Sequence, residues 1–218
     1  SLIMVLADMV ESRDKHTGHH VKKTAAYTRI IMEQMRREGM HPDVLTDEYI
    51  DSVVQSAPLH DVGKIEVPDA LLNKPGKLTD EEYAQMKNHT LAGKRIIARS
   101  AEAAAESDYL EEAGQLAEFH HERWDGKGYP HGRAGEDIPL SARVMAVADV
   151  FDALVSKRSY KEGFPIEKAL DIIRDGIGTQ FDPQVAQAFL DAEEEVRRVA
   201  REHSEHDCEE PAADAKTE

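Results

Sequence analysis

Hydrophobic positions recur along most of the chain three or four residues apart, which is the spacing of an amphipathic helix. The predicted helices cover residues 2 to about 12, 21 to about 38, 46–57, about 109–122, 141–157, 165–175 and 182–201. No alternating pattern of comparable length predicts a strand, and the sequence contains no internal repeat. The pattern therefore predicts an all-α bundle.

One further helix has a clear start signal. Thr79 is followed three residues later by Glu82, the spacing of a capping box in which each side chain satisfies a backbone N–H of the other residue. We expect this helix to continue for about three turns and to carry His89.

The stretch Trp124–Pro139 is rich in glycine and proline and predicts an ordered loop. Gly126 and Gly128 offer two places for a positive φ, and Pro130 restricts the conformation that follows. Tyr129 would thereby be held rigidly, where it could border a cleft. A purely structural loop is the alternative.

Length and composition favour one domain. The chain has 218 residues, of which 40% are hydrophobic, enough for one core of ordinary size. We expect an N-terminal helix at 1–12, a catalytic domain at 13–202 and an acidic disordered tail at 203–218. The chain starts with Ser1 and an apolar run, so we expect that first helix to continue from an upstream sensor or membrane anchor.

Charge narrows the classes of ligand. The net charge is −16, which argues against a nucleic-acid polymer because such a ligand needs a basic surface. A small anionic substrate remains compatible if metal ions and a few local cations set the field in the cleft. The single cysteine, Cys208, excludes an intrachain disulfide and favours a cytoplasmic protein, or the cytoplasmic part of a membrane-anchored one.

Seven potential metal ligands are spread through the chain. They are His20, His60, Asp61, His89, His120, His121 and Asp149. Five imidazoles and two carboxylates exceed what one tetrahedral zinc can use, so two or more ions are expected. Adjacent cations suit hydrolysis of phosphate esters, since they activate water and stabilise the attacking and leaving oxygens. A single histidine on a helix is more often a surface residue, but two adjacent pairs argue against coincidence.

Four motifs carry a family resemblance. RDKHTGHHVKK, LHDVGK, HHERWDGKGYP and ADVFDALVSKRSYK occur in that order between about residues 10 and 189. Together they resemble the HD-GYP domain, a branch of the HD phosphohydrolase superfamily whose members hydrolyse cyclic di-GMP. The resemblance implies an HD-superfamily helical bundle with a site for two metal ions, or three, in its core.

The resemblance also implies roles for the ligands. His20 matches the histidine of the opening motif, Asp61 would bridge two ions, and Asp149 completes the first ion's ligands. His89, His120 and His121 match the ligands of the second ion. Family members proposed to hold a third ion carry Glu where this chain has His16, so two ions are favoured and His16 is a third-metal or supporting residue. Iron or manganese is favoured by the resemblance, with zinc as the alternative.

Substrate contacts follow from position and from the resemblance. Lys64 stands four residues after His60, which on a helix would place its ammonium on the metal face, ready for a phosphate oxygen. In the family, the positions of Arg158 and Lys161 contact the second phosphate and a guanine. The GYP element around Tyr129 is also a proposed docking surface for GGDEF-domain proteins.

The expected reaction is hydrolysis of cyclic di-GMP to linear pGpG, with a second cleavage to GMP left open, as the output of a bacterial signalling protein. The sequence names no clear general acid among metal-bound water, Lys64 and His16. Three alternatives remain: a phosphohydrolase for another nucleotide such as cyclic GMP-AMP, a sensor that binds without turnover, and a structural interaction module.

Overall fold

The structure is a computed structural model that describes residues 2–14, 20–103, 108–156 and 163–206. Its α-helices are α1 (Leu2–Glu11), α2 (His20–Arg37), α3 (Asp47–Ser56), α4 (Asp69–Leu72), α5 (Asp80–Lys87), α6 (His89–Ala103), α7 (Asp108–Phe119), α8 (Leu140–Val155), α9 (Ile166–Asp175), α10 (Pro183–Asp191) and α11 (Glu193–His206). Short 3-10 turns are η1 (Ser12–Asp14), η2 (Ala57–Leu59), η3 (Val62–Glu66) and η4 (Gly135–Asp137). Within these ranges the β contacts amount to an isolated bridge between Ile177 and Phe181, which confirms the all-α class.

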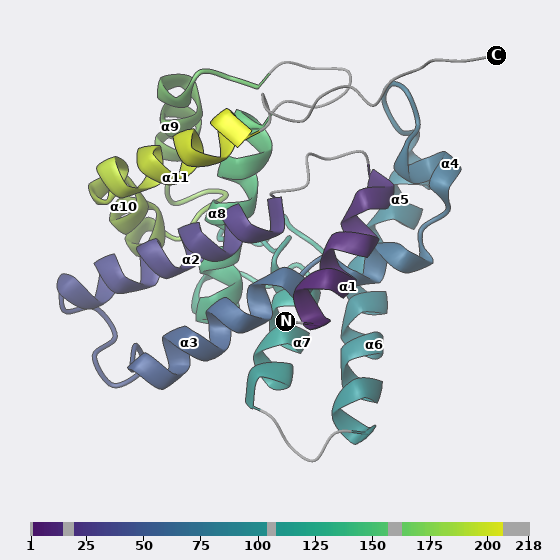
Figure 1. Ribbon diagram of the computed structural model, residues 1–218, viewed down its shortest axis with the longest axis horizontal. Coiled ribbons are helices and arrows are strands. Elements are labelled where there is room, and N and C mark those ends of the chain that lie inside the picture. The colour runs from purple at the N-terminus through teal and green to yellow at the C-terminus, as the bar shows by residue number, and fades with distance from the viewer. Residues whose placement is uncertain (1, 15–19, 104–107, 157–162, 207–218) are drawn as a thin grey trace.

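Helix α8 is the centre of the bundle. It is apolar around most of its circumference, and a helix of that kind is stable only when neighbours cover every side. Helices α2, α7, α9 and α10 pack against it (Figure 1). Phe151 of α8 meets Tyr27 of α2 edge-on, with ring centroids 5.3 Å apart, and Phe189 of α10 at 4.9 Å. This packing fixes α2 against α8.

Helices α6 and α7 run side by side as a pair that extends from the bundle (Figure 1). A smaller apolar cluster holds them together and to the turn before the His-Asp pair. Its buried members are Leu59, Ile97, Leu110, Ala113 and Ala117. The start of α6 is thereby brought to η3, which follows Asp61, and α7 is brought to η2, which precedes His60.

The predicted capping box is confirmed, and a further N-cap is present. Thr79 and Glu82 form the reciprocal capping box at the start of α5, and Thr46 caps α3 by accepting a hydrogen bond from the backbone N–H of Tyr49. The predicted helices at the N-terminus, at 46–57 and at 165–175 are present to within a residue or two.

One predicted helix ends earlier than expected, and another is divided in two. The helix that starts at Thr79 stops at Lys87, so the expectation that it carries His89 is wrong: His89 opens α6. Helix α5 has no buried residue, so no packing holds the two segments in line. The helix predicted at 182–201 is interrupted at Ala192, which caps α10 before α11 begins.

The C-terminal boundary also differs from the prediction. Helix α11 runs to His206, one turn beyond the expected start of the disordered tail at 203, and it begins with three acidic residues that suit a helix N-terminus. Residues 207–218 lie outside the described ranges.

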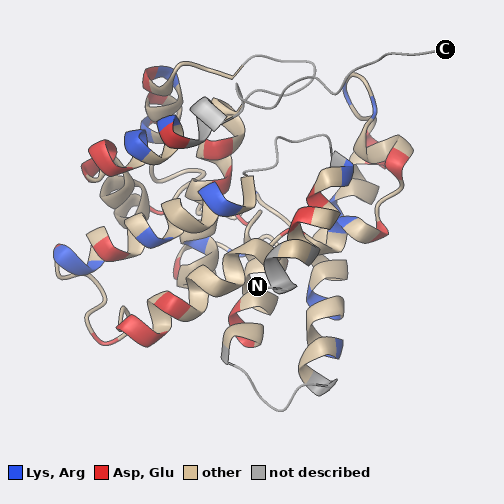
Figure 2. Cartoon of the chain, in the orientation of Figure 1, with Lys and Arg blue, Asp and Glu red and all other residues tan. Residues whose placement is uncertain are grey.

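Charged positions are spread over the helices, with acidic side chains prominent on α3 (Figure 2). Among the described helices, none is both long and apolar enough to cross a membrane.

Candidate metal centre

The predicted ligands converge from the ends of elements. His20 is the first residue of α2, and His60 with Asp61 joins η2 to η3. His89 opens α6, so its side chain lies where α6 meets η3 and α7. Helix α7 stops at Phe119 and does not reach residue 122 as predicted, so His120 and His121 lie in the turn that follows. At a helix end the backbone changes direction, which lets two adjacent side chains face one centre.

Backbone carbonyls orient three of the imidazoles. The Nδ1 atoms of His60, His89 and His120 each lie 2.8 Å from a carbonyl oxygen, those of Ala57, Met86 and Leu116 respectively. Because a carbonyl oxygen can only accept, Nδ1 carries the proton and donates it. In each neutral ring the lone pair is then on Nε2, the form that a metal ion requires.

The inward-facing atoms form two groups that share Asp61. One comprises Asp61, His89, His120 and His121, the other His20, His60 and Asp61, and in each the ligand atoms lie within 4.8 Å of one another. Asp61 Oδ1 is 3.3 Å from His89 Nε2 and 3.6 Å from His120 Nε2, and Asp61 Oδ2 is 3.5 Å from His60 Nε2. Ligands about 2.1 Å from one ion are separated by about 3.4 Å, so these spacings fit a metal centre.

Asp149 completes the group around His20. Its Oδ1 atom lies 3.4 Å from His20 Nε2 and 3.9 Å from His60 Nε2. It comes from the middle of α8, so the central helix of the core also supplies a carboxylate to the cluster. The structure therefore brings all seven predicted ligands together.

Buried polar atoms that lack hydrogen-bond partners support a metal centre at this position. Among the described residues, the Nε2 atoms of His60, His89 and His120 and Oδ1 of Asp61 are buried without a hydrogen-bond partner. Such groups cost free energy unless a partner such as a metal ion satisfies them. Burial lowers the pKa of His60, and it lowers that of His89 to about 4, so both rings are neutral at pH 7. The site fits divalent metal binding.

Lys64 lies beside Asp61. Its ammonium is 2.7 Å from Asp61 Oδ2, and it follows on the 3-10 turn η3 and not on the α-helix that was expected. Burial would raise the pKa of the Asp61 carboxyl, but the nearby Lys64 and histidines outweigh it and hold that pKa well below its usual range. Asp61 is therefore ionised.

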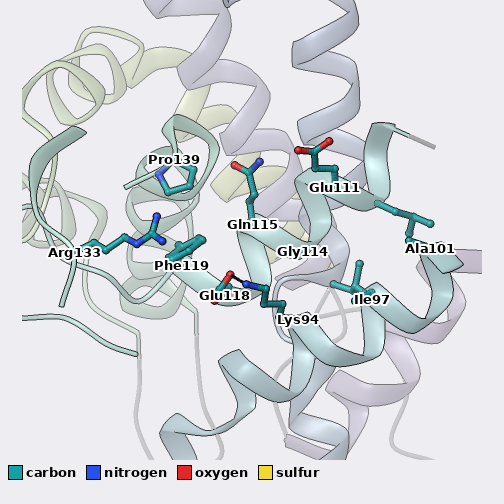
Figure 3. Close-up of a pocket in the computed structure, with 12 residues that line it drawn as sticks. Lys94, Ile97, Ala101, Glu111, Gly114, Gln115, Glu118, Phe119, Arg133 and Pro139 are labelled. Carbon is teal, nitrogen blue, oxygen red and sulfur yellow. Dashed lines mark ion pairs between the residues drawn. The ribbon is translucent and has the colours of Figure 1, made fainter. Parts of the chain in front are cut away.

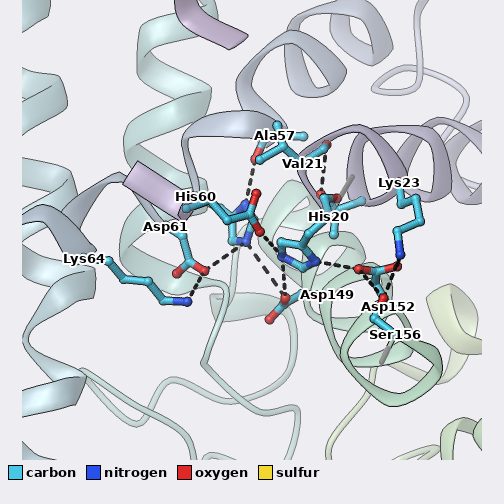
Figure 4. A network of polar contacts seen from close by, with 12 residues as sticks. His20, Val21, Lys23, Ala57, His60, Asp61, Lys64, Asp149, Asp152 and Ser156 are labelled. Atoms are coloured by element: carbon cyan, nitrogen blue, oxygen red, sulfur yellow. Dashed lines mark hydrogen bonds and ion pairs between the residues drawn. The ribbon is translucent and has the colours of Figure 1, made fainter. Parts of the chain in front are cut away.

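Sequence reasoning missed three charged residues around His20, two of which, Lys23 and Asp152, are labelled in Figure 4. Asp152 Oδ2 lies 2.6 Å from His20 Nδ1, Lys23 Nζ lies 2.9 Å from Asp152 Oδ1, and Glu11 Oε1 lies 3.8 Å from His20 Nε2. Glu11, His60, Asp61 and Lys64 also line a small cavity of about 10 Å³. Helical spacing offered a signal, since Asp152 is three residues after Asp149 and Lys23 three after His20.

The loop 124–139 brings Tyr129 to the cluster. Its ring stacks on His121 with centroids 4.8 Å apart, and it meets Tyr83 of α5 at 6.2 Å. Gly126 has the predicted positive φ, +75°, whereas Gly128 does not. Gly128 is required for close approach instead: a Cβ there would lie 2.5 Å from the carbonyl oxygen of His121.

Three predicted residues, His16, Arg158 and Lys161, lie outside the described residues. The end of α8 at Val155 and the cap Ser156 mark where the segment bearing Arg158 and Lys161 begins.

A larger hollow of about 770 Å³ lies elsewhere, between α6, α7 and the loop 124–139 (Figure 3). Lys94 and Glu118, which are 2.5 Å apart, and Arg133, whose guanidinium lies 4.3 Å from the centre of the Phe119 ring, contribute to its wall. None of the seven predicted metal ligands lines it, so this larger hollow is separate from the candidate metal centre.

Comparisons with known proteins agree with this geometry. A cyclic di-GMP phosphodiesterase of Vibrio cholerae is 46% identical over 91% of this chain and 40% of its own length. A 3'3'-cGAMP-specific phosphodiesterase of the same organism is 38% identical over 87% of this chain and 34% of its own. The chain thus spans less than half the length of either relative.

A solved structure shares the fold. An HDG"Y"P protein from Bdellovibrio bacteriovorus superimposes with a TM-score of 0.59, at 22% identity, over 81% of this chain and 52% of that one. The HD domain family matches residues 4–185, a range that contains every ligand described above. The chain therefore belongs to the HD domain family.

Proposed function

We propose that the chain is a metal-dependent phosphodiesterase domain that hydrolyses cyclic di-GMP to pGpG, with GMP as the product of a second cleavage. The observation that carries the proposal is the pair of ligand groups that share Asp61. The 46% identity to a cyclic di-GMP phosphodiesterase supports the choice of substrate.

We propose two transition-metal ions, one held by His20, His60, Asp61 and Asp149 and the other by Asp61, His89, His120 and His121. Iron or manganese is favoured, because mixed histidine and carboxylate ligands suit both, and zinc is the alternative. When bound, such ions activate water and stabilise charge on the phosphate oxygens. A third ion would involve His16, which stands where family members proposed to hold a third ion carry Glu.

The remaining side chains would bind and orient the substrate. Lys64, held 2.7 Å from Asp61, would present its ammonium to a non-bridging oxygen of the reacting phosphate. Tyr129, stacked on His121, would form one wall of the substrate site. Arg158 and Lys161 would hold the second phosphate and a guanine, where an arginine can bind a phosphate through two parallel hydrogen bonds.

The loop around Tyr129 would dock a GGDEF-domain protein, since the ring lies at the junction of α5 and the cluster. A cytoplasmic location is compatible with the single cysteine, Cys208.

A second candidate substrate is cyclic GMP-AMP, favoured by the 38% identity to a 3'3'-cGAMP-specific phosphodiesterase. A sensor that binds a cyclic dinucleotide without turnover is the remaining alternative. It is disfavoured because all seven ligands are present.

The test is product chromatography after anaerobic purification and reconstitution with Fe²⁺ or Mn²⁺, using cyclic di-GMP, cyclic GMP-AMP and a cyclic mononucleotide. We expect cyclic di-GMP to be cleaved fastest. Arg158→Ala should raise KM about tenfold or more with a smaller change in kcat, because a hydrogen bond to a charged group contributes about 1.5–3 kcal/mol. Binding of cyclic di-GMP with no product from reconstituted protein would favour the sensor.

A further inference from the structure

His20 is oriented differently from the other histidines whose Nδ1 contacts are described. Where His60, His89 and His120 donate to backbone carbonyls, the Nδ1 of His20 faces a carboxylate, Asp152 Oδ2, at 2.6 Å. Figure 4 shows Asp152 on the far side of His20 from Asp149 and His60. Asp152 thus contacts the ring edge that points away from the cluster.

Asp152 is itself held by two groups. Its side chain is completely buried, and Lys23 Nζ lies 2.9 Å from its Oδ1. Lys23 Nζ also donates to Ser156 Oγ at 2.6 Å, and Ser156 Oγ donates to Asp152 Oδ2 at 3.2 Å. Lys23 is nearly as buried as its partner. A buried carboxylate and ammonium are tolerated when they are paired and hydrogen-bonded, as here.

The network joins two helices of the core. His20 and Lys23 lie one turn apart on α2, and Asp152 and Ser156 lie one turn apart at the end of α8. One imidazole is therefore fixed by three side chains from two helices, Lys23, Asp152 and Ser156, and its other nitrogen, Nε2, lies 3.4 Å from Asp149 Oδ1.

We infer that Asp152, held by Lys23 and Ser156, is a positioning residue that sets the affinity of the His20 half of the site for its metal ion. A carboxylate that accepts the Nδ1 proton keeps the lone pair on Nε2 and makes that nitrogen a more basic ligand than a backbone carbonyl does. The effect is confined to one of the two ion positions, since His89, His120 and His121 belong to the other group. This inference rests on the two-ion site of the proposed function.

The test compares wild type with Asp152→Asn by titration with Mn²⁺ and by electron paramagnetic resonance. We expect wild type to bind two ions that give the signal of an interacting pair. In Asp152→Asn one ion should bind as in wild type and the other about 10- to 100-fold more weakly, the usual effect of losing such a partner. At limiting Mn²⁺ the variant should then show the spectrum of isolated ions.

A control variant separates positioning from stability. Asp182→Asn disrupts another buried carboxylate pair, with Arg143 Nη1 at 2.5 Å from Asp182 Oδ2, at the cap of α10. We expect it to lower the melting temperature while both ions bind with wild-type affinity. Ser156→Ala removes one hydroxyl from the network, so it tests the inference if Asp152→Asn does not fold, and it should weaken the same ion by a smaller factor.

Failure of the inference about Asp152 can be distinguished from failure of the proposed function. If wild type binds two Mn²⁺ and Asp152→Asn, or Ser156→Ala where the first variant does not fold, binds both with unchanged affinity, the inference is overturned and the proposed function stands. If reconstituted wild type binds fewer than two, the proposed function fails and the inference fails with it.

Discussion

The histidines of the cluster are fixed in two different ways. His89 and His120 are held by carbonyls three and four residues earlier in the chain, whereas His20 is held by Asp152, 132 residues later. The first kind of contact forms wherever the local backbone turns. The second exists only after α2 and α8 have packed. The orientation of His60, His89 and His120 is therefore a local product of the chain, whereas that of His20 depends on the assembled core.

The different surroundings of His89 and His20 also shift their pKa values in opposite directions. Burial lowers the pKa of His89 to about 4. Burial also opposes charge on His20, but its contacts with Asp149 and Asp152 outweigh burial and raise its pKa well above the usual 6.5. In the ion-free protein His89 is thus neutral, whereas His20 holds a proton that a metal ion must displace.

Removing the residue that both halves share should have the largest effect. We expect Asp61→Ala to lower kcat/KM more than about 100-fold, because several kcal/mol of charge stabilisation would be lost and about 1.4 kcal/mol corresponds to tenfold. Steady-state kinetics and elemental analysis measure it, with Asp51→Ala, an exposed carboxylate paired with Arg29, as the control. Near-normal turnover in Asp61→Ala would remove the bridging role.

The second-largest effect should come from a substitution in η3 that forces this turn away from α6. A Cβ on Gly63 would overlap the carbonyl oxygen of His89 and the backbone nitrogen of Gly93, and backbone atoms cannot move aside easily. We expect Gly63→Ala to lower the free energy of unfolding by about 1–3 kcal/mol, as overpacking does. Denaturant titration measures this. Gly114→Ala in α7 is the control, since its Cβ would meet only Ile97 Cγ2 at 3.9 Å among its nearest neighbours. An equal effect of both substitutions would contradict the steric argument.

Acidification should act on one half first. Below the raised pKa of His20, its proton competes with the ion, so affinity at that half should fall by up to about tenfold per pH unit. His89, with a pKa of about 4, stays neutral from pH 8 to 5, so its half should keep its ion. Without ions, the raised pKa of His20 adds stability below pH 6.5 that is lost as pH rises through the folded-state pKa. Mn²⁺ content measured against pH would disprove this if both ions left together.

The smallest effect should come from His16. We expect His16→Ala to keep two ions and measurable activity, and His16→Glu to raise metal content toward three, because a carboxylate supplies the negative charge that a third cation favours. Elemental analysis of both variants tests this, and the control is His19→Ala, at the histidine that precedes His20 in the opening motif. Loss of both ions in His16→Ala would make it a primary ligand.

The sequence by itself determined the helical class, most helix positions and the identity of the seven candidate ligands that the structure brings together. Helical periodicity survives in any amphipathic helix, and ligand types follow from chemistry that a motif displays directly. It did not predict that His89 opens a new helix, because α5 buries none of its residues and so offers no periodic signal that ends at Lys87. Nor did it predict the stop at Phe119, which lets His120 and His121 face the same centre.

The tertiary structure alone decided how His20 is held. Asp152, Lys23 and Ser156 look like ordinary helix and cap residues in the sequence, and their spacing shows only which face of each helix they occupy. Their role arises because the apolar contacts of Tyr27, Phe151 and Phe189 press α2 and α10 onto α8. Hydrophobic packing is not directional, so a sequence specifies which faces are buried, while the contacts across them depend on how the helices pack.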